Sequence, residues 1–137
     1  MLGTVPDFFT FDDLTAWTAP LCTLSPPARL AVIGDPVGHS RSPQMHNPAL
    51  LACGINAQYI RVQVPVGSVG QALRAFAIRG FLGVNVTIPH KFEALETVDV
   101  VDPLARRLGA VNTVAMRAGV LHGFNTCLLY TSPSPRD

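Results

Sequence analysis

Short apolar runs alternate with segments of helical periodicity along most of this sequence. Leu30-Ala-Val-Ile-Gly34 is typical: it is continuously apolar, as expected of a strand buried on both faces, and a glycine ends it. We expect strands at Leu30–Gly34, Tyr59–Val64, Phe81–Thr87, Val111–Met116 and Val120–Gly123, and helices at Ser42 to about Ala52, Val66–Ile78, His90–Leu95 and Pro103–Leu108. Because strands that alternate with helices favour parallel pairing, the pattern predicts an α/β fold with three layers, a mostly parallel sheet with helices on both faces.

The helix expected from Ser42 has a defined start and end. Ser42 is a suitable N-cap, Pro43 suits the first helical position, and Gly54 follows the last turn. At helical spacing its apolar face would consist of Met45, Ala49, Leu50 and Cys53.

Changes in composition divide the chain into three parts. Residues 1–28 carry scattered aromatic residues and a proline-rich stretch that ends at Pro27, which indicates an N-terminal arm or short helix followed by a linker. Residues 29–126 hold the expected strands and helices. Residues 127–137 include Ser132-Pro-Ser-Pro135, whose prolines oppose regular structure, and we interpret them as a tail.

Composition and charge narrow the class of function. A hydrophobic fraction of 48% over 137 residues suffices for one globular domain. The net charge of +1 indicates neither nucleic-acid nor membrane-surface binding, so we expect a small-molecule partner. With no membrane-spanning run and no secretory signal pattern, a cytoplasmic protein is expected. The cysteines Cys22, Cys53 and Cys127 lack a metal-binding spacing, so no metal site is expected.

The loop after the first predicted strand, Gly34-Asp-Pro-Val-Gly-His-Ser40, can be compared with a dinucleotide-binding loop. It lacks the GxGxxG spacing, and a proline stands where the tight phosphate turn would be. The loop does place hydroxyl groups, Ser40 and Ser42, beyond the carboxyl end of a strand, where small ligands bind in such folds. Local sequence alone favours a simpler interpretation, in which Ser42 is only a helix cap.

Two further clusters of polar residues follow predicted strands. In Asn85-Val-Thr-Ile-Pro-His-Lys91, the single lysine of the chain could exchange a proton or hold a fixed positive charge against an oxygen. A solvated lysine at the start of a helix is the simpler alternative. Asn112-Thr113 and Asn125-Thr126 place amides and hydroxyls at strand ends, which suits recognition of hydroxyl or carboxylate groups. Each cluster alone is a weak signal.

Taken in order, four segments resemble the shikimate dehydrogenase family: Gly34-Asp-Pro-Val-Gly-His-Ser-Arg-Ser-Pro-Gln-Met-His-Asn47, Val84-Asn-Val-Thr-Ile-Pro-His-Lys91, Gly109-Ala-Val-Asn-Thr113 and Gly123-Phe-Asn-Thr126. The resemblance implies that this chain is the substrate-binding domain only. It implies that Ser40 and Ser42 bind the carboxylate of shikimate and that Thr87, Lys91 and Asn112 contact its ring hydroxyls. Lys91 would be the catalytic residue.

The resemblance also implies what the remainder of the enzyme supplies. An aspartate directly after Asn125-Thr126 would work beside Lys91 on the proton of the C3 hydroxyl while hydride passes to NADP. NADP would be bound by a C-terminal domain that is absent from this chain, and no cofactor-binding residue is expected within it. The implied activity is the reversible, NADP-dependent reduction of 3-dehydroshikimate to shikimate on the route to chorismate and the aromatic amino acids.

The sequence departs from the family at Cys127, which stands where the family has that aspartate. A thiol is not a permanently ionised partner near neutral pH. Residues 127–137 resemble the in-frame translation of a transposase adapter used for sequencing libraries, so we interpret them as a non-native tail and expect the chain itself to be inactive. Two alternatives stay open: an enzyme, and a non-catalytic module that binds shikimate or quinate. Both a monomer and a homodimer suit such a fold.

Overall fold

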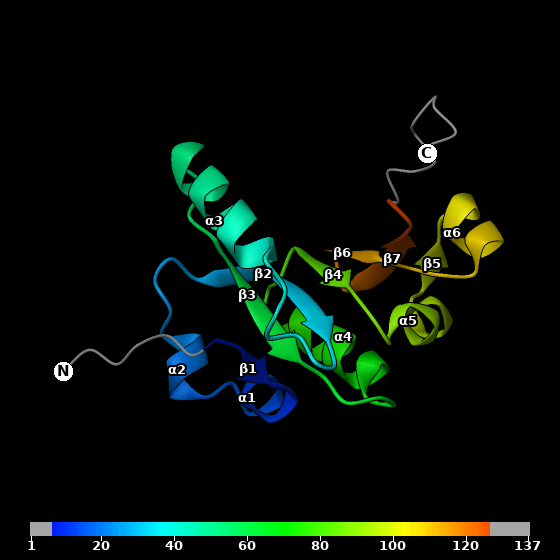
Figure 1. Ribbon diagram of the computed structural model, residues 1–137, viewed down its shortest axis with the longest axis horizontal. Helices are drawn as coiled ribbons and strands as arrows, with labels where there is room; N and C mark the ends of the chain where they lie inside the picture. The colour runs from blue at the N-terminus through cyan, green and yellow to red at the C-terminus, as the bar shows by residue number, and fades with distance from the viewer. Residues whose placement is uncertain (1–6, 127–137) are drawn as a thin grey trace.

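The computed structural model describes residues 7–126, and Figure 1 shows their arrangement. The strands are β1 (Phe9–Thr10), β2 (Ala28–Gly34), β3 (Gln58–Gln63), β4 (Gly83–Val86), β5 (Val100–Val101), β6 (Thr113–Arg117) and β7 (Val120–Phe124). The helices are α1 (Phe11–Ala16), α2 (Ala19–Cys22), α3 (Ser42–Ala52), α4 (Val69–Ile78), α5 (Lys91–Thr97) and α6 (Pro103–Leu108). The predicted alternation of strands and helices is confirmed from Ala28 onward.

The strands form one sheet in the order β1-β3-β2-β4-β6-β7-β5. Pairing is parallel between β1 and β3, β3 and β2, β2 and β4, and β5 and β7. It is antiparallel between β4 and β6 and between β6 and β7, which a tight turn joins at Ala118 and Gly119, with φ of 52° and 80°. The mostly parallel sheet that the sequence predicts is therefore confirmed.

Helices cover both faces of the sheet, which confirms the three layers. The larger core lies on one face and includes side chains from α1, α2, α4, α5 and α6, such as Leu14, Leu21, Phe76, Ala94 and Ala105. The smaller core, on the other face, contains Val32, Val37 and Tyr59, and Leu50 of α3 packs against it. Side chains alternate between the faces along β2, as expected for a strand buried on both sides.

The sequence interpretation of α3 was wrong in two respects. Arg41, rather than Ser42, is the N-cap, and Ser42 is already helical. The expected apolar face is largely exposed: Met45 is 68% exposed, and Ala49 and Cys53 are also exposed. Of the expected residues, Leu50 does pack toward the sheet. It shares its face with Pro43, His46 and Asn47, which are also less exposed.

Specific polar contacts explain which face of α3 meets the sheet. The Asn47 side chain accepts a hydrogen bond from the Tyr59 backbone N–H at 2.7 Å and donates one to the Tyr59 carbonyl at 3.0 Å. The His46 ring stacks on the Tyr59 ring at a centroid distance of 4.5 Å. Because of these contacts, the more polar face of α3 packs against β3, and its more hydrophobic face is exposed.

The segment before Ala28 contributes to the sheet and to the larger core. β1 pairs with β3, and Phe9, Leu14 and Leu21 are each at most 2% exposed. Helix α1 begins with a reciprocal cap: the Asp13 N–H donates to the Thr10 hydroxyl, and the Thr10 N–H donates to the Asp13 carboxylate. The sequence analysis did not predict β1, α1 or α2 as elements of the sheet and its cover.

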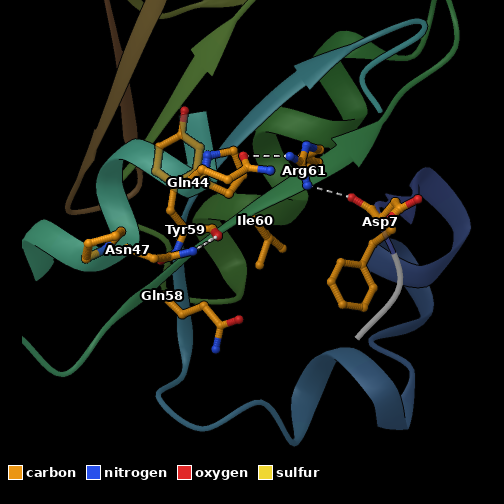
Figure 2. A pocket seen from close by; sticks show the side chains of 10 residues that line it. Asp7, Gln44, Asn47, Gln58, Tyr59, Ile60 and Arg61 are labelled. Atoms are coloured by element: carbon orange, nitrogen blue, oxygen red, sulfur yellow. Dashed lines mark hydrogen bonds between the residues drawn. The ribbon is translucent and has the colours of Figure 1, made fainter. Parts of the chain in front are cut away.

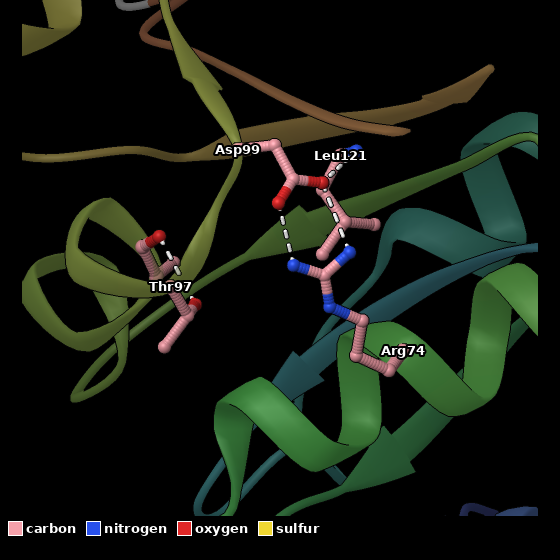
Figure 3. A network of polar contacts seen from close by, with 5 residues as sticks. Arg74, Thr97, Asp99 and Leu121 are labelled. Carbon is pink, nitrogen blue, oxygen red and sulfur yellow. Dashed lines mark hydrogen bonds and ion pairs between the residues drawn. The ribbon is translucent and has the colours of Figure 1, made fainter. Parts of the chain in front are cut away.

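An ion pair joins α4 to the segment just before β5, the last strand in the order of the sheet (Figure 3). The guanidinium of Arg74 donates to both oxygens of Asp99, at 2.6 and 2.9 Å, just before β5. Asp99 also accepts from the Leu121 N–H of β7 at 2.8 Å. Within residues 7–126, no helix has the length and apolar character needed to cross a membrane.

Candidate functional site

The strand order brings four polar segments to one edge of the sheet. The carboxyl ends of β2 and β4 share this edge because the two strands are parallel, and the antiparallel β6 starts here while β7 ends here. Backbone hydrogen bonds join the segments: Thr87 N to the Ile33 carbonyl at 2.9 Å, Val86 N to the Asn112 carbonyl at 2.8 Å, and Asn112 N to the Phe124 carbonyl at 3.0 Å.

A cavity of about 310 Å³ lies at this edge, where loops follow β2 and β4. Three of the predicted site residues, Ser40, Ser42 and Thr87, are among the residues that line it. The others are Val32, Pro36, Val37, His39, Asn85, Val86 and Ile88. The cavity thus combines hydroxyl, amide and imidazole groups with an apolar floor, which suits a small polar ligand.

The loop with the two serines is held by its own backbone and by β3. The Ser42 N–H donates to the Ser40 hydroxyl at 3.3 Å, and the Ser40 N–H donates to the Val37 carbonyl at 3.0 Å. Arg61 of β3 donates from its Nε to the Ser40 carbonyl at 2.7 Å. The loop therefore approaches the sheet with both serine side chains half-buried at the cavity.

Lys91 and Asn112 lie at the same edge of the sheet but are not among the residues that line this cavity. Lys91 is half-buried and is the first residue of α5, and its carbonyl accepts a hydrogen bond from Val111 N, beside Asn112, at 3.0 Å. The buried His90 fixes the start of α5, because its Nε2 donates to the Val64 carbonyl at 2.6 Å.

Hydrogen bonds connect Asn112 to the cavity wall. The Asn112 Oδ1 accepts from the Thr113 hydroxyl at 3.0 Å, and Thr113 accepts from the Asn85 Nδ2 at 3.3 Å. Asn85 lines the cavity and accepts from the Tyr59 hydroxyl at 2.7 Å. The structure thus groups Ser40, Ser42 and Thr87 around one hollow and links Asn112 to it through two other residues.

Asn85, which lines the cavity, and Tyr59, which donates to Asn85 but does not line this cavity, were not predicted as site residues from the sequence. Burial raises the pKa of the Tyr59 hydroxyl to about 12, and a hydrogen bond from the Ser42 side chain acts in the opposite direction. The signal that could have found Tyr59 is the alternation along β3, which puts Tyr59 and Arg61 on one face, the face toward α3.

A larger cavity, of about 500 Å³, lies between α3, β3 and the segment before β1 (Figure 2). None of the predicted site residues lines it. Its lining includes two charged residues, Asp7 and Arg61. Arg61 donates to the Gln44 side chain at 2.7 Å and to the Asp7 carbonyl at 3.0 Å, so much of its hydrogen-bonding capacity is used within the protein. We therefore place the candidate site in the smaller cavity, where hydroxyl groups converge.

The chain matches a family model described as the shikimate dehydrogenase substrate binding domain over residues 32–114. It is 47% identical, over 95 residues, to shikimate dehydrogenase (NADP(+)) of Bacillus cytotoxicus, a match that covers 69% of this chain and 34% of the relative. The chain therefore spans about a third of the length of this curated relative.

Solved structures agree with this match. Shikimate 5-dehydrogenase of Thermus thermophilus, in complex with NADP(H) and shikimate, is 45% identical with a TM-score of 0.69, covering 72% of this chain and 38% of that one. A 5-ketofructose reductase of Gluconobacter is 30% identical with a TM-score of 0.68, covering 71% and 35%. The sheet, the polar edge and these matches together show that the chain belongs to the shikimate dehydrogenase substrate-binding domain family.

Proposed function

We propose that this chain is the substrate-binding part of an NADP-dependent shikimate dehydrogenase that interconverts 3-dehydroshikimate and shikimate, on the route to chorismate and the aromatic amino acids, in the cytoplasm. The observation that carries the proposal is the cavity at the sheet edge, where Ser40, Ser42 and Thr87 converge from two loops. We further propose that residues 29–126 hold all the ligand contacts that this chain supplies.

Each of these side chains has a role that its chemistry suits. The hydroxyls of Ser40 and Ser42 would donate to the substrate carboxylate, and charge-assisted hydrogen bonds of this kind are strong. Thr87 and Asn112 would hydrogen-bond the ring hydroxyls, since a hydroxyl and an amide can each pair with an alcohol. The apolar floor formed by Val32 and Val37 would cover the ring carbons.

Lys91 is the catalytic residue in this proposal. Its ammonium would hydrogen-bond the oxygen at the reacting carbon and supply or accept that oxygen's proton. A neutralising carboxylate would normally stand beside it, and the corresponding position here, Cys127, lies outside the described residues. The rigid start of α5 supports this role, because His90 anchors it beneath the end of β3.

The residues at the end of β2 do not fit a dinucleotide. Asp35 and Pro36 follow Gly34, so the glycine-rich turn that would receive a pyrophosphate is missing. We accordingly propose that NADP is held outside this chain, and that hydride transfer needs that further part of the protein.

Calorimetry with shikimate on the 137-residue chain tests the proposal. Wild type should bind, and Ser42→Ala should weaken binding about tenfold or more, because it removes a donor to a charged group. Ser68→Ala is a matched control, since Ser68 precedes α4, does not line this cavity and makes no capping bond. Absence of binding at millimolar shikimate, or equal affinity of the three proteins, would reject the proposal.

A second candidate function is a module that binds shikimate or quinate without chemistry. If Cys127 belongs to the natural protein, the replacement of the expected carboxylate favours this function. A dehydrogenase assay on the complete gene product separates the two functions. Turnover of shikimate with NADP supports the enzyme, whereas calorimetric binding of shikimate or quinate without turnover supports the module.

A further inference from the structure

A chain of hydrogen bonds crosses the sheet from β3 to the end of β7. The Tyr59 hydroxyl donates to Asn85 Oδ1 at 2.7 Å, Asn85 Nδ2 donates to the Thr113 hydroxyl at 3.3 Å, and that hydroxyl donates to Asn112 Oδ1 at 3.0 Å. Tyr59 belongs to β3, Asn85 to β4 and Thr113 to β6, and Asn112 is the residue before β6. This series of hydrogen bonds thus joins the wall of the candidate cavity to Asn112.

The direction of this series of hydrogen bonds is fixed at its far end, at Asn112. The backbone N–H of Thr126 donates to Asn112 Oδ1 at 2.9 Å, and a backbone N–H can only donate. This sets the oxygen of the Asn112 carboxamide toward Thr126, so Thr113 donates to that oxygen. Asn85 must then offer its NH₂ to Thr113 and its oxygen to Tyr59.

The near end of the series of hydrogen bonds, at Tyr59, is held rigidly. Tyr59 is 3% exposed, its ring is stacked on His46, and Asn47 bonds both its backbone N–H and its carbonyl. A phenol fixed in this way can hold a hydrogen-bond partner in place at little entropic cost. The Tyr59 hydroxyl therefore reaches Asn85, which lines the cavity, from a fixed position.

We propose that Tyr59 is a positioning residue, which acts through Asn85 and Thr113 to fix the Asn112 carboxamide. One N–H of the Asn112 NH₂ donates to Asn125 Oδ1 at 3.4 Å, and the other is the one that would meet the ligand. The inference rests on the proposed function and deepens it. Because Asn112 Oδ1 is occupied by donors from Thr113 and Thr126, the ligand group opposite Asn112 must be an oxygen that accepts a hydrogen bond.

The first test needs no ligand. In the ¹⁵N-labelled 137-residue chain, the side-chain NH₂ signals of Asn112 are assigned by their loss in Asn112→Ala. Tyr59→Phe, which keeps the ring and removes the hydroxyl, should shift these signals, and Thr113→Val should shift them as well. Thr97→Val is the control matched to Thr113→Val, because the Thr97 hydroxyl donates to the Ala94 carbonyl of α5.

The second test is a double-mutant cycle on shikimate affinity, measured by calorimetry. Tyr59→Phe should weaken binding about three- to tenfold, the usual effect of one neutral hydrogen bond. In the Asn112→Ala background, the same change should have less than about a twofold effect, because its route to the ligand is gone. An undiminished effect in that background would mean that Tyr59 acts elsewhere.

The outcomes of the two tests distinguish a failure of the positioning role from a failure of the proposed function. Asn112 signals that do not move in Tyr59→Phe overturn the positioning role whether or not shikimate binds. If the signals move but the wild-type chain does not bind shikimate, the proposed function is rejected while the positioning of Asn112 stands.

Discussion

Gly34, the last residue of β2, lies close to the segment that follows β4 at the candidate site. A Cβ atom added there would lie 2.6 Å from Thr87 Cγ2 and 3.2 Å from the carbonyl oxygens of Pro36 and Ile88. Because Gly34 has no side chain, Thr87 can pack against the loop that carries Ser40 and Ser42.

We expect Gly34→Ala to destabilise the chain by about 1–3 kcal/mol, the usual cost of forcing atoms into a packed region. It should also weaken shikimate binding, since Thr87 is displaced from the cavity. Urea unfolding and calorimetry measure the two effects. Gly38→Ala in the same loop is the control, because its added Cβ would meet only Phe8, at an ordinary 3.6 Å. Equal stability of the two variants would contradict the prediction.

At the level of elements, the contact between α4 and the β5 edge gives Asp99 an unusual acidity. Hydrogen bonds from Arg74 and from the Leu121 N–H lower the pKa of Asp99 from 3.8 to about 2. A depressed pKa in the folded state means that the stabilisation is present above about pH 4 and is lost as the pH falls toward 2.

An NMR titration of the Asp99 carboxyl checks this prediction. Arg74→Gln should raise the midpoint of the Asp99 titration toward the ordinary pKa of an aspartate. The folded protein should then no longer lose the stability that depends on this group as the pH falls from about 4 toward 2. Arg79→Gln is a suitable comparison, because Arg79 contacts Trp17 and the Thr15 carbonyl instead. A wild-type midpoint near 4 would show that the ion pair does not persist in solution, as exposed pairs often do not.

The sequence predicted elements well where hydrophobic periodicity decides their placement, and less well where polar contacts do. In α4, Val69, Leu73 and Phe76 are buried as their spacing predicts. In α3, by contrast, Asn47 and His46 face the sheet because they bond and stack on Tyr59, and no hydrophobicity pattern could indicate that. The two-residue strand β1 is too short to leave a period-two signal.

The candidate site could be predicted in part for a topological reason. Ser40, Ser42 and Thr87 each follow a parallel strand, and carboxyl ends of parallel strands share an edge. Tyr59 itself lies inside a strand. Its link to Asn112 depends on two hydrogen bonds between strands far apart in the sequence and on a third between the neighbours Thr113 and Asn112. Such a link follows from the register of the sheet, which the linear sequence does not reveal.

At the scale of the whole molecule, the question is whether the segment before Ala28 belongs to the folding unit. The family match begins only at residue 32, and the sequence indicated an arm. In the structure, however, Phe9, Leu14 and Leu21 pack in the same core as Ile33, Val62 and Phe76. We infer that the unit that folds cooperatively begins near Phe9.

Leu14→Ala tests this inference. Leu14 is fully buried in α1, so its truncation should lower the free energy of unfolding by about 2–5 kcal/mol, the range for a leucine removed from a core. Leu51→Ala is the matched control: it is also a helical leucine, but 80% exposed, and should change stability by less than about 0.5 kcal/mol. Because the two substitutions share the same change in helix propensity, their difference in a urea titration isolates burial. If Leu14→Ala is as mild as Leu51→Ala, the segment is an arm after all, and the sheet beyond it is stable without its first strand.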